Sequence, residues 1–179
     1  MNARIWRLTT IAAPIMLLVG AAALYAAPVS AAQPLAGTDA SGLSDSAGKV
    51  QLQARFADAV AKDGTRSLVV HLHMGHGWHV NAHPASMEFL IPTQVSARAG
   101  DTEVALETNY PPGVDSGIKL SGAAIKVYND DTRIDATLPA ASVEAGKAAG
   151  SLTVAVRIQA CSDKGFCLPP SRLDQRLKW

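Results

Sequence analysis

The segment Leu152-Thr-Val-Ala-Val-Arg-Ile-Gln-Ala-Cys-Ser-Asp-Lys-Gly-Phe-Cys-Leu-Pro-Pro170 joins an apolar run to a short loop between two cysteines. Its first half is rich in valine and isoleucine, which is typical of a buried β-strand. Gly165 permits a sharp reversal that would bring the Cα atoms of Cys161 and Cys167 within bridging range. Two prolines then restrict the backbone after the second cysteine. The segment therefore predicts a strand that ends in a rigid cysteine loop.

Similar apolar or alternating segments recur along the chain, separated by turn signals such as Asp63-Gly64 and Pro111-Pro-Gly113. The candidate strands are Val50–Phe56, Ser67–His73, Phe89–Ala97, Thr102–Leu106, Ala124–Tyr128, Thr132–Leu138, Ser151–Ala160 and Arg172–Trp179. Only Ala140–Ala149 has a composition that also fits a helix, and it fits a loop or a single turn equally well. About eight short strands without crossover helices predict an all-β fold, an antiparallel β-sandwich.

The N-terminus has the pattern of a secretory signal peptide. Arg4 and Arg7 precede an uncharged apolar stretch, and Val29-Ser-Ala31 supplies small residues for cleavage. We expect residues 1–31 to be the signal peptide, 32–48 a flexible leader and 49–179 one domain. The mature chain would be periplasmic, with no membrane insertion after cleavage. An uncleaved anchor is the alternative, because the apolar stretch is about as long as the shortest membrane-spanning helices.

Charge and motifs exclude several classes of function. The signal contains two of the 16 basic residues and none of the 15 acidic ones, so the mature net charge is about −1. No basic stripe remains that would favour nucleic acid or an anionic membrane surface. The sequence has no P-loop or dinucleotide fingerprint, and we expect no cofactor.

The two cysteines would pair in an oxidising compartment, because they are the only two in the chain. A structural staple is one interpretation of the pair. However, a closed loop of roughly seven residues stabilises by only about 2.4 kcal/mol, against about 4.7 for a hundred-residue loop. A local pair at a strand end also leaves its sulfurs near a loop, where another thiol can reach them. A redox-active pair and a sandwich binding domain with a purely structural disulfide both remain open at this point.

The cysteine segment resembles that of the N-terminal periplasmic domain of the thiol:disulfide interchange protein DsbD. Two cysteines with five residues between them, Phe before the second and Pro-Pro after it form the specific part of the likeness. Supporting segments, in the expected order, are Gly77-Trp-His-Val-Asn81, Ile91-Pro-Thr93, Tyr110-Pro-Pro-Gly113 and Val127-Tyr128. The resemblance covers roughly residues 48 to 179. It implies an immunoglobulin-like β-sandwich that transfers electrons in the periplasm as a component of protein-disulfide reduction.

The resemblance also implies roles for individual residues. Cys167 would form the mixed disulfide with a partner, and Cys161 would resolve it. The family's cap loop corresponds to Asp115–Gly122, where Leu120 is the nearest substitute for an aromatic cap. The other supporting candidates are His79, Asn81, Asp163 and Phe166. We expect thioredoxin-like periplasmic proteins as partners and a separate membrane thiol reductase as electron donor, because the chain ends at Trp179 without the membrane and thioredoxin domains of the full-length protein.

All five histidines fall between His71 and His83, which suggests an alternative function. In an exported protein such a cluster favours copper or zinc, with imidazole nitrogens and the Met74 thioether as ligands. On a strand, His71 and His73 share a face, and glycines around His76 would allow it to fold back toward them. The competing interpretation is a solvent-facing strand without a metal.

Overall fold

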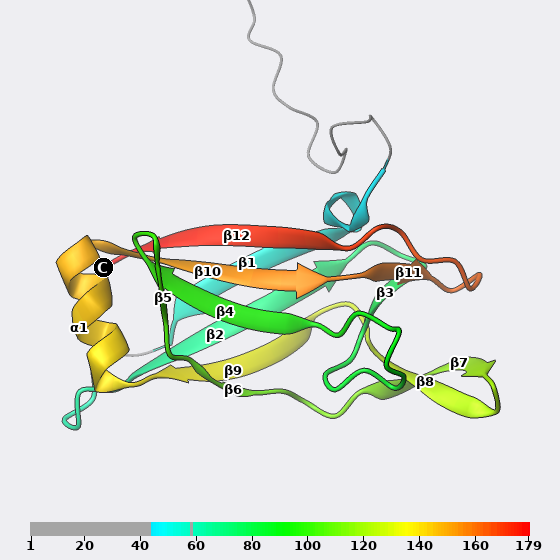
Figure 1. Ribbon diagram of the computed structural model, residues 1–179, viewed down its shortest axis with the longest axis horizontal. Helices are drawn as coiled ribbons and strands as arrows, with labels where there is room; N and C mark the ends of the chain where they lie inside the picture. The colour runs from blue at the N-terminus through cyan, green and yellow to red at the C-terminus, as the bar shows by residue number, and fades with distance from the viewer. Residues whose placement is uncertain (1–43, 58) are drawn as a thin grey trace, which may run out of the picture. The chain divides into compact units, whose positions relative to one another are not determined.

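The computed structural model describes residues 44–57 and 59–179, which form mostly antiparallel β-sheet with little helix (Figure 1). The expected signal peptide, residues 1–31, and the expected leader up to residue 43 lie outside the described residues. Within the described ranges, no helix has the length and hydropathy needed to cross a membrane. The prediction of an all-β fold is confirmed.

Two four-stranded sheets form the sandwich, with strand orders β1-β2-β9-β6 and β12-β10-β4-β5. All neighbouring strands in both sheets are antiparallel. The first sheet contains β1 (Val50–Phe56), β2 (Arg66–Met74), β9 (Thr132–Leu138) and β6 (Glu107–Asn109). The second contains β12 (Ser171–Lys178), β10 (Ser151–Ile158), β4 (Gln94–Ala99) and β5 (Thr102–Val104). In Figure 1, β12, β10 and β4 lie over the strands of the first sheet.

The core lies between these sheets because their inward-facing residues are apolar. In β1, Val50 and Ala54 are buried, whereas Gln51 and Gln53 face solvent, as the period of a strand requires. The central strand β10 is apolar nearly throughout, since it has a partner strand on each side. The core residues from both sheets include Leu68, Val70, Leu72, Ile134, Leu138, Leu152, Val154, Val156 and Ile158. Burial of each large apolar side chain of this kind stabilises the folded protein by about 1.5–3 kcal/mol.

A third sheet, with the order β11-β3-β8-β7, extends the strands of the sandwich at one end (Figure 1). It contains β11 (Ala160–Ser162), β3 (Trp78–Asn81), β8 (Ala123–Tyr128) and β7 (Val114–Leu120). The chain runs from β10 into β11 through Gln159, and from β2 into β3 through a turn that includes Gly77, whose φ is 79°. The first cysteine thus lies in β11, directly beyond the most buried strand of the sandwich.

The segment Ala140–Ala149 forms a complete α-helix, α1, so the helical alternative is the one the structure adopts. The reason lies in contacts distant in sequence. Ser142 is buried and donates to the Ala105 carbonyl at 2.8 Å, and Val143 lies in the core. Gly150, with φ 67°, ends the helix in the left-handed conformation.

Two predicted segments differ from the structure. The strand expected from Phe89 begins only at Gln94, because Pro92 lacks the N–H that a sheet ladder requires. Phe89 instead lies in a turn in which the Leu90 N–H donates to the Met87 carbonyl at 3.1 Å, and it is 67% exposed. The segment Asp115–Gly122, expected to be a loop, mostly forms β7, which pairs with β8. The hairpin turns at Ser121 and Gly122, both with positive φ, as two-residue hairpin turns require.

Candidate redox site

Cys161 and Cys167 form a disulfide whose Cα atoms are 4.0 Å apart. The two residues face each other as an antiparallel pair across a short hairpin. The flanking hydrogen bonds run from the Ser162 N–H to the Phe166 carbonyl (2.8 Å) and from the Leu168 N–H to the Ala160 carbonyl (2.9 Å). The cysteines therefore occupy a non-hydrogen-bonded position, where opposite Cα atoms approach most closely, at about 4.5 Å. This position explains why their separation is shorter than in most disulfides.

The loop of the hairpin consists of Asp163, Lys164 and Gly165. The Gly165 N–H donates to the Ser162 carbonyl at 2.9 Å, and Gly165 has φ 88°. A type I turn followed by a left-handed residue is the usual three-residue hairpin loop, and glycine is the residue that adopts that conformation without strain. The Asp163 N–H also donates to the Gly77 carbonyl at 3.0 Å, which fastens the loop to the turn before β3.

The two cysteines differ in exposure. Cys161 is buried, with 5% of its surface exposed, whereas Cys167 is exposed. Thiol–disulfide exchange proceeds by attack of a thiolate on one sulfur, so access determines which sulfur is attacked. In this hairpin the residue open to an incoming thiol is Cys167.

An imidazole lies beside the buried cysteine. His79 pairs with Cys161 across β3 and β11, so both side chains lie on the same face of the sheet. His79 is buried, and its Nδ1 is 3.0 Å from Oδ1 of Asp163, whose side chain is 68% exposed. When Asp163 accepts a hydrogen bond from Nδ1, the neutral ring keeps Nε2 as its proton acceptor. The fold thus brings together two supporting candidates that are distant in sequence, His79 and Asp163.

On the other face of the same strand pair, Phe166 meets Trp78 edge to face, with ring centroids 5.6 Å apart. Phe166 is 51% exposed and directly precedes the exposed cysteine. The Lys49 ammonium lies 5.1 Å from the centroid of the Trp78 ring. An exposed apolar side chain therefore precedes Cys167 in sequence and points to the opposite face of the hairpin.

The two remaining supporting candidates have other surroundings. Asn81 is buried, and its amide donates to the Ile91 carbonyl at 3.1 Å and to the Gln159 side chain at 3.3 Å. Asn81 thereby anchors the residue that links β10 to β11. Leu120 lies at the end of β7, opposite Ala123, and is 41% exposed.

Ser46 supports the cysteine hairpin and was not predicted from the sequence. It belongs to a short 3-10 helix, η1 (Ser46–Lys49), and is fully buried, although residues 32–48 were expected to form a flexible leader. Its Oγ donates to the Pro169 carbonyl at 2.6 Å and accepts from the Ala160 N–H at 2.8 Å. Ser46 thus joins the strand before the first cysteine to the segment after the second. The local sequence signal is limited to Asp45, which caps η1.

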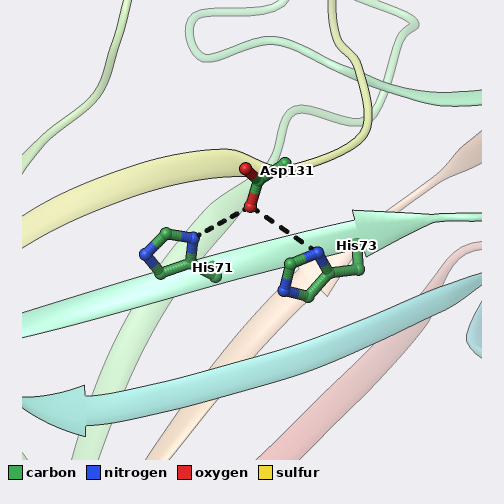
Figure 2. Close-up of side chains that lie close together, drawn as sticks. All are labelled: His71, His73 and Asp131. Carbon is green, nitrogen blue, oxygen red and sulfur yellow. Dashed lines mark hydrogen bonds and ion pairs between the residues drawn. The ribbon is translucent and has the colours of Figure 1, made fainter.

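The histidine cluster is only partly assembled as expected. His71 and His73 lie side by side on β2, and the third residue that approaches them is Asp131 (Figure 2). His76 is exposed in the turn after β2 and is not part of this group. Met74 was expected as a further ligand, but it is 5% exposed and packs in the core, because it follows His73 on the opposite face of the strand.

A sequence model of the family described as "Thiol:disulfide interchange protein DsbD, N-terminal" matches residues 47–178. The chain belongs to this family. The matched range includes both sheets of the sandwich and the cysteine hairpin. It begins one residue after Ser46, the first residue of η1. The family predicted from the cysteine segment is therefore confirmed, and a disulfide-bonded cysteine pair in a DsbD N-terminal domain is consistent with a thiol–disulfide exchange module.

Two crystal structures resemble this DsbD-like fold. The N-terminal periplasmic domain of ScsB from Proteus mirabilis gives a TM-score of 0.55 at 13% identity, covering 73% of this chain and 46% of that one. The Neisseria meningitidis DsbD n-terminal domain in the reduced form gives a TM-score of 0.43 at 16% identity, covering 68% of this chain and 81% of that one. The chain thus spans less than half of the ScsB chain that it matches, and at 13% identity the likeness to ScsB shows the fold alone. No curated protein sequence matches the chain.

Proposed function

We propose that this chain is a periplasmic thiol–disulfide exchange module that passes reducing equivalents through Cys161 and Cys167. The observation that supports this function best is the unequal exposure of the two bonded cysteine residues in a DsbD N-terminal domain. In this proposal the donor is a separate membrane thiol reductase, and the acceptors are oxidised thioredoxin-like periplasmic proteins.

The proposed reaction consists of two exchanges at Cys167. A donor thiolate attacks the Cys167 sulfur, the Cys161–Cys167 bond breaks, and Cys161 leaves as a thiolate that takes up a proton. The donor's second thiol then attacks the mixed disulfide, so the donor leaves oxidised and the module holds two thiols. In the second exchange Cys167 attacks an acceptor disulfide, and Cys161 resolves the mixed disulfide. Two electrons and two protons pass in each cycle.

The neighbouring side chains support this assignment. Phe166, on the opposite face of the hairpin from the disulfide, offers an exposed apolar contact for a partner that reaches Cys167. His79, held by Asp163, lies opposite Cys161 and is placed to exchange a proton with it. Asn81 donates a hydrogen bond to the side chain of Gln159, the residue between β10 and β11, and so helps to position the strand that contains Cys161. Leu120, on the β7–β8 hairpin, is the proposed cap residue.

The test uses variants with one thiol each, Cys161→Ala and Cys167→Ala, mixed with a thioredoxin-like protein in its disulfide form. We expect Cys161→Ala to accumulate a mixed disulfide, visible on a non-reducing gel and by mass spectrometry. Cys167→Ala is the matched control and should trap at least about tenfold less, because its remaining cysteine is buried.

The alternative function is a sandwich binding domain with a purely structural disulfide. It would be favoured if neither variant traps a partner and the wild-type bridge has a reduction potential below about −300 mV. Equal trapping by both variants would instead overturn the assignment of Cys167 as the attacked residue.

A further inference from the structure

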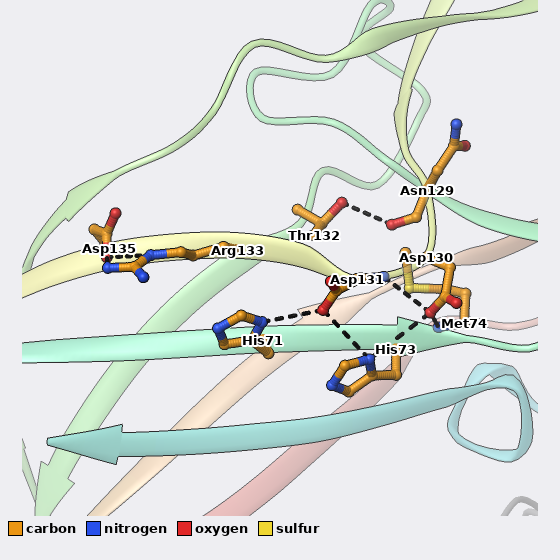
Figure 3. Close-up of polar contacts among 9 residues, drawn as sticks. All are labelled: His71, His73, Met74, Asn129, Asp130, Asp131, Thr132, Arg133 and Asp135. Carbon is orange, nitrogen blue, oxygen red and sulfur yellow. Dashed lines mark hydrogen bonds and ion pairs between the residues drawn. The ribbon is translucent and has the colours of Figure 1, made fainter. Parts of the chain in front are cut away.

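A second cluster of reactive side chains lies on the first sheet of the sandwich, outside the cysteine hairpin (Figures 2 and 3). His71 and His73 alternate with buried residues on β2, so both rings project from the outer face of that strand. Asp131 belongs to the turn between β8 and β9 and points its carboxylate toward the two rings. One ligand atom from each of the three residues lies within 4.8 Å of the other two.

The distances between the rings and the carboxylate are long for hydrogen bonds and lie near the spacing of ligands around one ion. The Nδ1 atoms of His71 and His73 lie 3.3 and 3.7 Å from the same oxygen, Oδ1 of Asp131. Both distances exceed the usual 2.7–3.2 Å of a hydrogen bond to nitrogen. Ligands bound tetrahedrally at about 2.0–2.1 Å are separated by about 3.3–3.4 Å. The spacing between the imidazoles and the carboxylate is therefore close to that of ligands around one metal ion.

The cluster is also held in place before any ion binds. The two imidazole rings are stacked, with centroids 6.0 Å apart and planes 13° from parallel, and the two side chains are only 26% and 33% exposed. The Asp130 carboxylate fixes the turn by accepting from the backbone N–H groups of Met74 and Asp131, each at 2.9 Å. The two histidines would need little side-chain ordering on binding, which favours affinity. The Asp131 side chain is 71% exposed, and its position is set by the backbone of the turn.

The charges around the cluster favour a cation. Asp130 places a second carboxylate 3.8 Å from His73. Arg133 lies opposite His71 on β9, but its guanidinium is bound to Asp135, with its Nη2 2.7 Å from Oδ1 (Figure 3). The nearby cation is thus already neutralised by its own carboxylate.

We propose that His71, His73 and Asp131 bind one divalent transition-metal ion of the Zn²⁺ or Cu²⁺ class. Two imidazole nitrogens and one carboxylate oxygen suit both ions, and Cu²⁺ binds the more tightly of the two at such ligands. Three protein ligands leave a fourth position for water or an exogenous ligand. This site does not depend on the cysteine pair and goes beyond the exchange function.

The experiment is titration calorimetry of the oxidised protein with Zn²⁺ and, separately, with Cu²⁺. The disulfide keeps the cysteine sulfurs from acting as ligands. We expect one ion per chain, and His71→Ala, His73→Ala and Asp131→Asn should each weaken binding at least about tenfold. Asn tolerates the positive φ of 58° at position 131, so Asp131→Asn removes the charge with little backbone strain.

His76→Ala is the matched control, because His76 is an exposed histidine near the cluster in sequence but not in the group. It should bind like the wild type. The Cu²⁺ complex should in addition show the electron paramagnetic resonance couplings of two imidazole nitrogens. Non-stoichiometric binding alone, or stoichiometric binding that the three substitutions leave unchanged, would overturn the site. Neither result bears on exchange at Cys167, which the trapping experiment measures separately.

Discussion

At the level of single residues, the contact between His79 and Asp163 supports the proposed role of His79 in proton transfer. Exchange requires one cysteine to lose a proton and another to gain one. His79 is buried directly opposite Cys161, and its other ring nitrogen is bound to a carboxylate at the surface. A histidine held in this way is placed to accept the proton of a neighbouring thiol.

We predict that His79→Gln slows exchange with a thioredoxin-like disulfide at least about tenfold at pH 7 and flattens the dependence of the rate on pH. The measurement is the rate of mixed-disulfide formation between pH 5 and 9. Asp163→Asn should shift the same profile to a smaller extent, and His76→Gln, in the exposed turn, should match the wild type. An equal slowing at every pH would show that His79 acts only through packing.

At the level of elements, the cysteine hairpin is held from outside by η1. Ser46 bonds both to the strand before Cys161 and to the segment after Cys167, across more than a hundred residues of sequence. The Asp163 backbone holds the tip of the same hairpin to the turn at Gly77. The loop that contains the disulfide is therefore fixed at its base and at its tip by separate segments.

Ser46→Ala should lower the free energy of unfolding by about 1–3 kcal/mol, because the buried Ala160 N–H loses its acceptor. Urea denaturation measures the loss, and faster hydrogen exchange at the Ala160 amide should localise it to the hairpin. The comparison is Ser67→Ala, at an exposed serine on β2, which should change stability by less than about 0.5 kcal/mol. A similar small change for Ser46→Ala would contradict the anchoring role.

At the level of the whole fold, α1 is fastened to the sandwich through the last residue of the chain. Trp179 packs on Gly146 of α1, and its ring meets Phe56 edge to face with centroids 4.9 Å apart. The Arg66 guanidinium lies 3.7 Å from the centroid of the Phe56 ring and 5.0 Å from that of Trp179. A Cβ added at Gly146 would lie 2.5 Å from the Trp179 ring.

Gly146→Ala is therefore expected to destabilise the protein by about 1–3 kcal/mol, although alanine in place of glycine normally stabilises a helix by about 1 kcal/mol. Thermal and urea unfolding measure the difference. The same substitution in a Trp179→Ala background should be neutral or stabilising, and this double-mutant cycle isolates the contact. Stabilisation in the wild-type background would show that the indole moves aside at little cost.

The sequence predicts those features of the fold and site that depend on neighbouring residues. Alternation gave Val50–Phe56 and Thr132–Leu138 the same bounds as β1 and β9, and the presence of only two cysteines predicted their pairing. Distant contacts have no such local pattern. Ser46 lies in a polar stretch, and Asp131 belongs to an ordinary turn sequence, so neither position indicated its role before the fold placed it.

The backbone hydrogen bonds on either side of the cysteine pair are independent of the bond between the sulfurs. When that bond is reduced, the same hairpin would keep the two thiols facing each other at a high effective concentration. Re-formation of the Cys161–Cys167 disulfide after each exchange with a partner would then need little further ordering of the chain. The release of a bound partner would consequently be an intramolecular step, whose rate does not depend on how much partner is present.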